Sequence, residues 1–311
     1  MKVSNNFSKL RDKLFPSESE RQLFEQALDA ARAQSPALIW VKDRPQESSF
    51  AMLERAAFQP SFVDRVAPDT RAGAHAFHEQ GFYYCLDCSS VFEASVTSVI
   101  SPKPRLVLDM CAAPGGKTVF LSRAFEPELL VANEAIRKRT AQLISNIRRC
   151  GIAARVCSRD PSFFAEQLPA AFDLVLVDAP CSGQSLLARG QKAPGCFHPS
   201  TINLCSNRQK RIVANAAASV AAGGYLAYMT CTYSPEENER VVEWLLKKFP
   251  QFHPCAVPTL AEFQSQLTEI PCYRLFPQQG LGAGGFTALL KNSEPPSEDR
   301  PSTEELLDRI G

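Results

Sequence analysis

The sequence predicts an α/β fold with a mostly parallel sheet that is covered by helices. From about residue 81 onward, short apolar runs alternate with helical patterns, which is typical of βαβ units. The runs expected to form strands are RLVLDM (105–110), LLVANE (129–134), ARVCSRD (154–160), FDLVLVDA (172–179) and GYLAYMT (224–230). Between them, IRKRTAQLISNIRRC (136–150) predicts an amphipathic helix with one face formed by Ile136, Thr140, Leu143 and Ile147. Ligands of such sheets bind outside the C-terminal strand ends.

The 311 residues are expected to divide into a small α+β domain, a main domain and a tail, which span 1–80, 81–291 and 292–311. The tail is rich in Pro, Ser and acidic residues, so we expect it to be disordered, with room for a short helix at its end.

Within the first 80 residues, the pattern changes several times. The first 16 residues indicate loose order. Ser17 and Glu20 can form a capping box for a helix over 17–34. The next three segments predict a strand, a helix, and a strand or turn, in the order ALIWV (37–41), SSFAMLERAAF (48–58) and QPSFVDRV (59–66).

The composition is ordinary for a globular protein, with 45% hydrophobic and 22% charged residues. No apolar run approaches the roughly 20 residues that cross a bilayer, and the start MKVSNNFSKLRDKLF is too polar for a secretory signal. We therefore expect a cytoplasmic protein that uses no membrane. Its 11 cysteines, an odd number in a long chain, are expected to be reduced thiols.

Charge is unevenly distributed, although the net charge is only +1. Residues 101–160 contain eleven basic and five acidic residues, whereas residues 292–311 contain two basic and six acidic ones. A basic face beside the expected site would suit a polyanion such as RNA. A solvated helix face explains the same charges equally well.

Acidic side chains stand at the ends of four consecutive expected strands: Asp109, Glu134, Asp160 and Asp178. Asp109 opens the Gly-rich turn DMCAAPGGKT (109–118), where small residues let the backbone approach a ligand. Such a turn alone is also consistent with a plain strand-to-helix connection. In nucleoside-binding folds, however, an acid about 20 residues further on binds the ribose hydroxyls, and a later one can accept from the adenine amino group. The set predicts an adenosine-bearing ligand.

Two cysteines are expected at the same edge of the sheet. Cys181 lies in DAPCSG, three residues beyond Asp178, and Cys231 ends the fifth expected strand. Two thiols that converge beside an acid indicate covalent catalysis. Beside an adenosine cofactor, this chemistry suits methylation of cytosine C5, because a thiolate that adds to C6 makes C5 nucleophilic enough to attack a methyl group. An acid near N3 would help the addition, and a second thiol could help the final elimination.

The motifs DMCAAPGGKT, DAPCSG and MTCTYSPEENE resemble the RsmB/NOP2/SUN family of RNA cytosine-C5 methyltransferases. The resemblance extends from GFYYCLDCSS (81–90) to LGAGGFTALLKN (281–292). It implies a class I methyltransferase (Rossmann-like) fold of seven strands, the last antiparallel, after an RRM-like N-terminal extension. It also implies S-adenosyl-L-methionine as cofactor and RNA (rRNA or tRNA) as partner, and we expect a monomer. Leu86 and WVK (40–42) depart from the family pattern.

The family resemblance implies a role for each residue of these motifs. The cofactor loop would consist of Cys111, Ala112, Ala113, Pro114, Gly115, Gly116 and Lys117. Glu134 would hold the ribose, Asp160 the adenine end, and Asp178 would border both cofactor and base. Cys231 would be the nucleophile, Cys181 would release the product, and Lys117 would lie near the reacting groups. DNA cytosine methyltransferases use the cysteine after the fourth strand, so the reverse assignment of the two thiols stays open.

The sequence disfavours two other functions and a metal site. A catalytically inactive methyltransferase fold that serves as an RNA-binding or assembly factor is disfavoured by the intact catalytic motifs. Methylation of an exocyclic amine would place an aromatic residue where DAPC has its thiol. A metal site is not expected, because the CxxC pair Cys85 and Cys88 has no second pair at suitable spacing.

Overall fold

The fold is described from a computed structural model, which covers the chain except residues 1–3, 31–34, 46–49, 69 and 296–299. Its centre is a sheet with the strand order β10-β11-β8-β7-β4-β5-β6, and β9 pairs with β11 outside this path. The strands are β4 (Leu106–Asp109), β5 (Leu129–Asn133), β6 (Arg155–Cys157), β7 (Phe172–Asp178), β8 (Val220–Thr230), β9 (Phe252–Pro254), β10 (Tyr273–Leu275) and β11 (Gly285–Asn292).

Strands β4 to β8 pair in parallel, whereas β11 is antiparallel to β8 and to β10. The path runs from β4 to β5 and β6 on one side, and from β7 to β8 on the other. The order therefore reverses between β4 and β7, and parallel sheets open a ligand crevice at such a point. The five predicted strands are confirmed, with β6 ending at Cys157 rather than Asp160.

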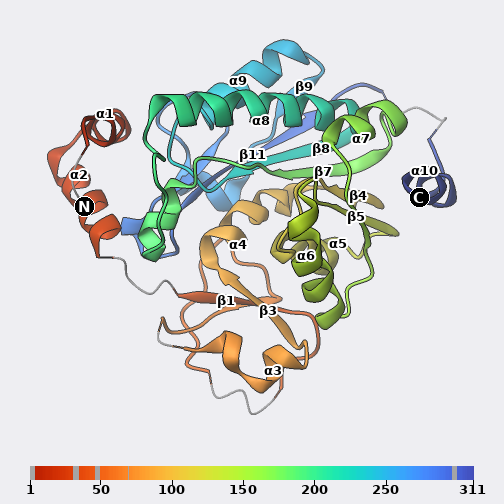
Figure 1. The fold of residues 1–311 in the computed structure, drawn as a ribbon, viewed down its shortest axis with the longest axis horizontal. Helices are drawn as coiled ribbons and strands as arrows, with labels where there is room; N and C mark the ends of the chain where they lie inside the picture. The colour runs from red at the N-terminus through yellow and green to blue at the C-terminus, as the bar shows by residue number, and fades with distance from the viewer. Residues whose placement is uncertain (1–3, 31–34, 46–49, 69, 296–299) are drawn as a thin grey trace.

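Helices cover both faces of this sheet (Figure 1). One face packs against α4 (Cys88–Ser95), α5 (Gly116–Phe125) and α6 (Arg137–Arg149), and the other against α7 (Pro161–Gln167), α8 (Pro199–Ser219) and α9 (Glu239–Lys248). Alternate residues of one strand serve the two faces: Val107 joins the first core, and Leu106 and Leu108 join the second. Burial on both sides explains why the strands appear in the sequence as nearly continuous apolar runs.

A second, three-stranded antiparallel sheet has the order β2-β1-β3 and comprises β1 (Pro36–Trp40), β2 (Val63–Arg65) and β3 (Tyr83–Asp87). The short helices η1 (Ala72–Ala74) and α3 (Ala76–Glu79) connect β2 to β3. Because β3 follows residue 80, the small sheet crosses the boundary expected there. Its residues Ala37, Ile39 and Val63 share a core with α4 and α5, so the two sheets are packed together.

Three local expectations were wrong. Residues 50–58 form no helix: Leu53 N–H donates to Arg65 O at 2.8 Å, so this segment pairs with the edge of β2, and a non-local contact overrides its helical pattern. Residues 46–49 of that expected helix lie outside the described residues. Ile136 precedes α6 and is 51% exposed, so only Leu143 and Ile147 of the predicted face are buried.

The third correction concerns the N-terminal segment, which forms α1 (Asn5–Leu14) and packs with α2 (Glu18–Asp29) through Phe7 and Phe24; α2 begins at the predicted Ser17 cap. The acidic tail, expected to be disordered with room for a short helix at its end, has that helix as α10 (Thr303–Ile310), whose Leu306 and Ile310 are at most 1% exposed in the core. Apolar residues spaced four apart let both helices dock, which composition alone did not indicate.

Candidate active site

A cavity of about 400 Å³ lies where the strand order reverses. One part of its wall is the loop after β4, and another is the end of β7 and the residue after β8. The remaining wall comes from β3, α4 and the 3-10 helix η3 (Gln184–Arg189). Predicted residues on this wall are Cys111, Ala112, Ala113, Pro114, Gly116, Lys117, Asp178 and Cys231. Three separate motifs of the sequence therefore meet around one cavity.

The loop after β4 needs small residues for two reasons. Gly115, at φ +114°, has a backbone conformation that other residues rarely adopt, and it caps α5. A Cβ on Gly116 would lie 3.0 Å from Cε1 of Tyr84. The Ala112 N–H donates to Asn133 O at 2.7 Å, which ties the loop to the end of β5. The start of α5 is thereby held against the cavity, where its first backbone N–H groups can meet a polar ligand.

Glu134, for which the family pattern implies contact with the ribose, is buried and is not among the residues that line the cavity. Its side chain is 4% exposed, and Oε1 accepts a hydrogen bond from Ile136 N–H at 2.8 Å. Oε2 is buried without a hydrogen bond, although the Arg139 guanidinium lies 3.3 Å away. A buried carboxylate oxygen without a hydrogen bond is costly, and a ribose hydroxyl would supply one. The site therefore suits the adenosine part of S-adenosylmethionine.

Asp160 is placed differently. Its carboxylate caps α7 by accepting from Ser162 N–H at 3.1 Å, and it forms an ion pair with Arg211 of α8 at 2.9 Å. The hydrogen bond from Arg211 lowers the pKa of Asp160, and its side chain is 51% exposed. It is not among the residues that line the cavity. Its role toward adenine stays a prediction.

The two cysteines meet as expected, with Sγ of Cys181 and Sγ of Cys231 3.2 Å apart. The pKa of Cys231 is lowered, first by the hydrogen bond from Cys181 and also by the Lys117 and Arg189 cations, against the effects of burial and Asp178. The pKa of Cys181 is raised well above its usual value, by the same hydrogen bond, burial and the nearby negative charges of Cys231 and Glu237. Cys231 is thus the thiol whose pKa is lowered, and it is the one on the cavity wall.

Lys117 lies between two carboxyl groups. Its Nζ donates to Asp178 Oδ2 at 2.6 Å and to Glu93 Oε2 at 2.5 Å. Burial lowers the pKa of Lys117, but the two acids outweigh it and raise the pKa overall. The lysine therefore stays charged beside Asp178, whose side chain is 33% exposed toward the cavity.

Three charged residues near the site had no assigned role in the sequence analysis: Glu93, Arg189 and Glu237. Glu237, fully buried, accepts from Ser182 N–H at 2.9 Å and from Gln209 Nε2 at 2.9 Å. It thus anchors the loop that carries Cys181. The signal was present in SPEENE (234–239), directly after the second cysteine motif. Arg189 lines the cavity from η3, with Nε 3.3 Å from Asp87 Oδ2.

The basic residues of α6 divide into two groups. Arg137, Lys138 and Arg148 are exposed. Arg139 donates to Ala113 O at 2.6 Å, and Arg149 to His78 O at 2.6 Å, so these two side chains brace the fold. Arg139 is nevertheless exposed, so four of the five candidates for RNA contact lie on the surface.

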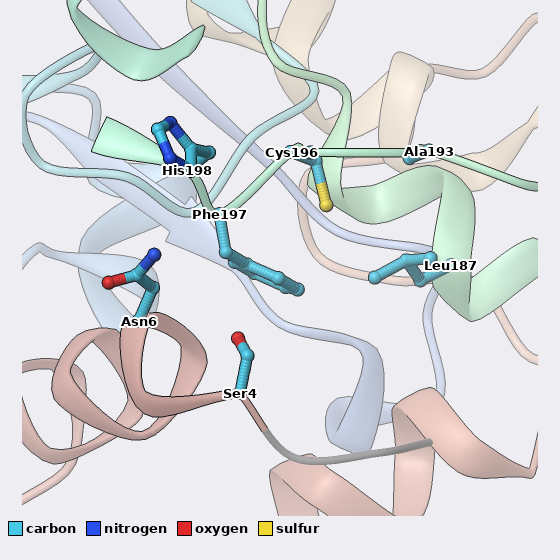
Figure 2. A pocket seen from close by; sticks show the side chains of 8 residues that line it. Ser4, Asn6, Leu187, Ala193, Cys196, Phe197 and His198 are labelled. Carbon is cyan, nitrogen blue, oxygen red and sulfur yellow. The ribbon is translucent and has the colours of Figure 1, made fainter. Parts of the chain in front are cut away.

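A second cavity of about 350 Å³ lies between α1 and the loop before α8. Leu187 of η3 lines it, together with Phe197 and the buried Cys196 (Figure 2). Leu186 and Arg189 line the first cavity instead. The helix η3 thus separates the two cavities, and none of the predicted site residues lines the second.

No group of three or more His, Cys, Asp or Glu side chains among the described residues is arranged to hold a metal ion. Within the same part of the chain, no helix has both the length and the apolar character that a membrane span requires.

The strand order, the antiparallel strand β11 and the position of the cavity together define a class I, Rossmann-like methyltransferase fold. The sequence matches the family model described as 16S rRNA methyltransferase RsmB/F over residues 98–291, and the chain belongs to this family. The resemblance to RsmB/NOP2/SUN proteins is thereby confirmed.

Similar curated proteins are named ribosomal RNA small subunit methyltransferase F. The protein from Klebsiella pneumoniae (strain 342) is 35% identical over 58% of this chain and 38% of its own length. The protein from Serratia proteamaculans (strain 568) is 30% identical over 76% of this chain and 50% of its own length. The chain thus spans half or less of the length of these relatives.

Two solved structures from Pyrococcus horikoshii share the fold. One, described as a methyltransferase homolog protein, has 22% identity and a TM-score of 0.75, and the match covers 94% of this chain and 96% of that one. The other, NSun6 with SFG, has 17% identity and a TM-score of 0.76, with 94% and 99% covered. At these identities the likeness concerns the fold.

Proposed function

We propose that the protein methylates C5 of a cytosine in RNA, with S-adenosylmethionine as methyl donor and Cys231 as nucleophile. The observation that supports this most strongly is the pair of thiols 3.2 Å apart, one of them on the wall of the cavity that the cofactor loop also lines. A methyltransferase that acts on an oxygen or an amine has no use for such a pair, whereas C5 of cytosine needs covalent activation.

The cofactor is held by the loop after β4 and by Glu134. Small residues in the loop admit the ligand close to the backbone, and the buried Oε2 of Glu134 is free to accept from a ribose hydroxyl. S-adenosylmethionine supplies the methyl group that C5 takes up. Asp160 is assigned to the adenine end, as the family pattern implies.

Cys231 begins the reaction as a thiolate. Its sulfur adds to C6 of a cytosine that has been turned out of its stack into the cavity. Addition moves electron density to C5, which becomes nucleophilic. Because the pKa of Cys231 is lowered by the hydrogen bond from Cys181 and by Lys117 and Arg189, its thiolate forms more readily than that of an ordinary cysteine.

Asp178 and Lys117 stabilise the negative charge that forms on the base when the thiolate adds. The carboxyl of Asp178 faces the cavity and can hold the N3 and amino edge of cytosine, while Lys117 fixes its position at 2.6 Å. A proton delivered to N3 neutralises the adduct.

Cys181 acts in product release. After methyl transfer, the C5 proton leaves to solvent and the bond between Cys231 and C6 breaks. The Cys181 thiol, kept protonated by the raised pKa, can donate to the sulfur as it becomes a thiolate again. The same hydrogen bond thus serves the nucleophile and the leaving group.

The RNA assigned here is small-subunit ribosomal RNA, in line with the names of the curated relatives. The exposed residues Arg137, Lys138 and Arg148 of α6 provide positive charge for phosphates. We assign residues 81–291 to the catalytic domain and residues 1–80, which contribute β1 and β2 of the small sheet, to RNA contact.

Covalent trapping tests the proposal. Cys181→Ala and Cys231→Ala variants are incubated with S-adenosylmethionine and either ribosomal or transfer RNA, then run on denaturing gels. We expect only Cys181→Ala to retain RNA, with the modified site found in small-subunit rRNA. Retention by Cys231→Ala alone would reverse the two roles.

The alternative function is an inactive methyltransferase fold that binds RNA as an assembly factor. If the wild type transfers no labelled methyl group to RNA and neither variant retains RNA, the catalytic proposal is wrong and the alternative takes its place.

A further inference from the structure

Glu93 is a buried acid that the proposed reaction has not yet used. It lies on α4, its side chain is 2% exposed, and its Oε2 accepts from Lys117 Nζ at 2.5 Å. Lys117 in turn contacts Asp178 at 2.6 Å. Glu93, Lys117 and Asp178 therefore form a continuous hydrogen-bonded chain, and all three line the cavity.

The fold provides a dedicated space for this carboxyl group. A Cβ built on Gly285 of β11 would lie 2.0 Å from Glu93 Oε1 and 2.9 Å from its Cδ. Any other residue at position 285 would push the carboxyl away from where it now lies. The Thr287 hydroxyl of the same strand also donates to the backbone O of Glu93 at 2.9 Å. Strand β11 thus holds Glu93 against Lys117.

The charges around Glu93 come from three directions. Lys117 faces it from α5, Asp178 from the end of β7 and Cys231 from the end of β8. The ammonium group of Lys117 is thus the counter-ion of two carboxyl groups, and it also lowers the pKa of the Cys231 thiol. A buried cluster with excess negative charge is unfavourable, so an additional proton is expected to stay in it. Burial, followed by the charge of Asp178, raises the pKa of Glu93 to about 8, although Lys117 opposes the change.

We propose that Glu93 stores the proton that Asp178 delivers to the cytosine, acting through Lys117. As Cys231 adds to C6, Lys117 Nζ gives a proton to Asp178 Oδ2, Asp178 gives one to N3, and Glu93 Oε2 replaces the proton on Nζ. When the thiolate leaves, N3 returns its proton and the three transfers reverse. One proton leaves Glu93 and one returns, so the store is refilled in each cycle.

This role rests on the proposed cytosine-C5 chemistry and makes Glu93 a positioning residue, because its proton passes to the substrate through Lys117 and Asp178. It predicts a specific pH dependence. The active form has Glu93 protonated, so the rate falls as the pH rises through the pKa of about 8. On the acidic side of the profile, the rate increases with pH because Cys231 ionises. The profile of the wild type is therefore bell-shaped.

The test compares single-turnover methyl transfer from pH 6 to 9.5 in the wild type, Glu93→Gln and Glu239→Gln. Glu239 is the matched control: it is a buried carboxylate, 2% exposed, paired with Arg274 at 2.5 Å and not among the residues lining the cavity. For Glu93→Gln we expect a rate at least tenfold lower at pH 7, loss of the falling limb near pH 8, and a KM for RNA within twofold of the wild type. The control is expected to keep the falling limb.

A second variant guards against misfolding. Gly285→Ala keeps Glu93 but displaces its carboxyl group, and we expect the same loss of the falling limb. If Glu93→Gln does not fold, the outcome for Gly285→Ala decides. If a folded variant keeps the fall in rate near pH 8, Glu93 is not the proton store, although the proposed methylation is unaffected. Absence of methyl transfer by the wild type overturns the proposed function and the store together.

Discussion

Replacement of Cys181 by alanine tests the charge arrangement of the site without any RNA. The change removes the hydrogen bond to Cys231 Sγ, which spans 3.2 Å. Hydrogen bonds to charged groups contribute about 1.5–3 kcal/mol, and 1.36 kcal/mol corresponds to tenfold in an ionisation equilibrium. The thiolate fraction of Cys231 near pH 7 should therefore fall roughly ten- to hundredfold, because the first cause of its lowered pKa is gone.

Alkylation measures this fraction directly. Wild type and Cys181→Ala are treated with iodoacetamide from pH 6 to 10, and peptide mass spectrometry follows residue 231 alone. The midpoint for Cys231 should move to higher pH in the variant. The matched variant Cys231→Ala should leave Cys181 unreactive at neutral pH, since burial and Glu237 still raise its pKa. A midpoint for Cys231 that stays in place, or a reactive Cys181, would refute the assigned direction of the hydrogen bond.

The remaining predictions concern stability and RNA binding. Leu306→Ala should lower the free energy of unfolding by about 2–5 kcal/mol, since the side chain is fully buried; a denaturation curve equal to that of the wild type would mean that α10 does not dock in solution. Exchange of Arg137 and Lys138 for Gln should weaken RNA binding and reduce the slope of log K against log salt by roughly 0.7–0.9 for each lost phosphate contact. An unchanged slope would mean that this helix face is only solvated. Glu237→Gln should lower the pKa of Cys181, because it removes one of the charges that raise it, and alkylation of residue 181 would detect this.

The central sheet could be predicted because its signals are local. Each parallel strand is buried on both faces, so the chain shows a compact apolar run such as FDLVLV (172–177) at every strand. The segment near Leu53 failed for the opposite reason. Its extended conformation depends on Arg65 of β2, and no pattern within the segment itself carries that information.

The same distinction applies to the site. Cys181 and Cys231 could be placed together from sequence, because the C-terminal ends of parallel strands meet at one edge of a sheet. Glu93 could not, since it comes from α4, ahead of the first predicted parallel strand, and reaches Lys117 only through packing against β11. Asp160 was expected at the end of a strand, and this expectation does not hold. The strand stops at Cys157, and the acid is used to cap α7.

The unequal surroundings of the two thiols explain how one pair can hold two roles. Both are buried cysteines at neighbouring strand ends, and the sequence alone gives no reason for either to ionise first. Lys117 and Arg189 lower the pKa of Cys231 and Asp178 raises it, whereas Glu237 raises the pKa of Cys181. The two sulfurs lie 3.2 Å apart, but only Cys231 lines the cavity that Asp178 and Lys117 also line. This placement favours Cys231 as the nucleophile for a physical reason that is independent of the family pattern.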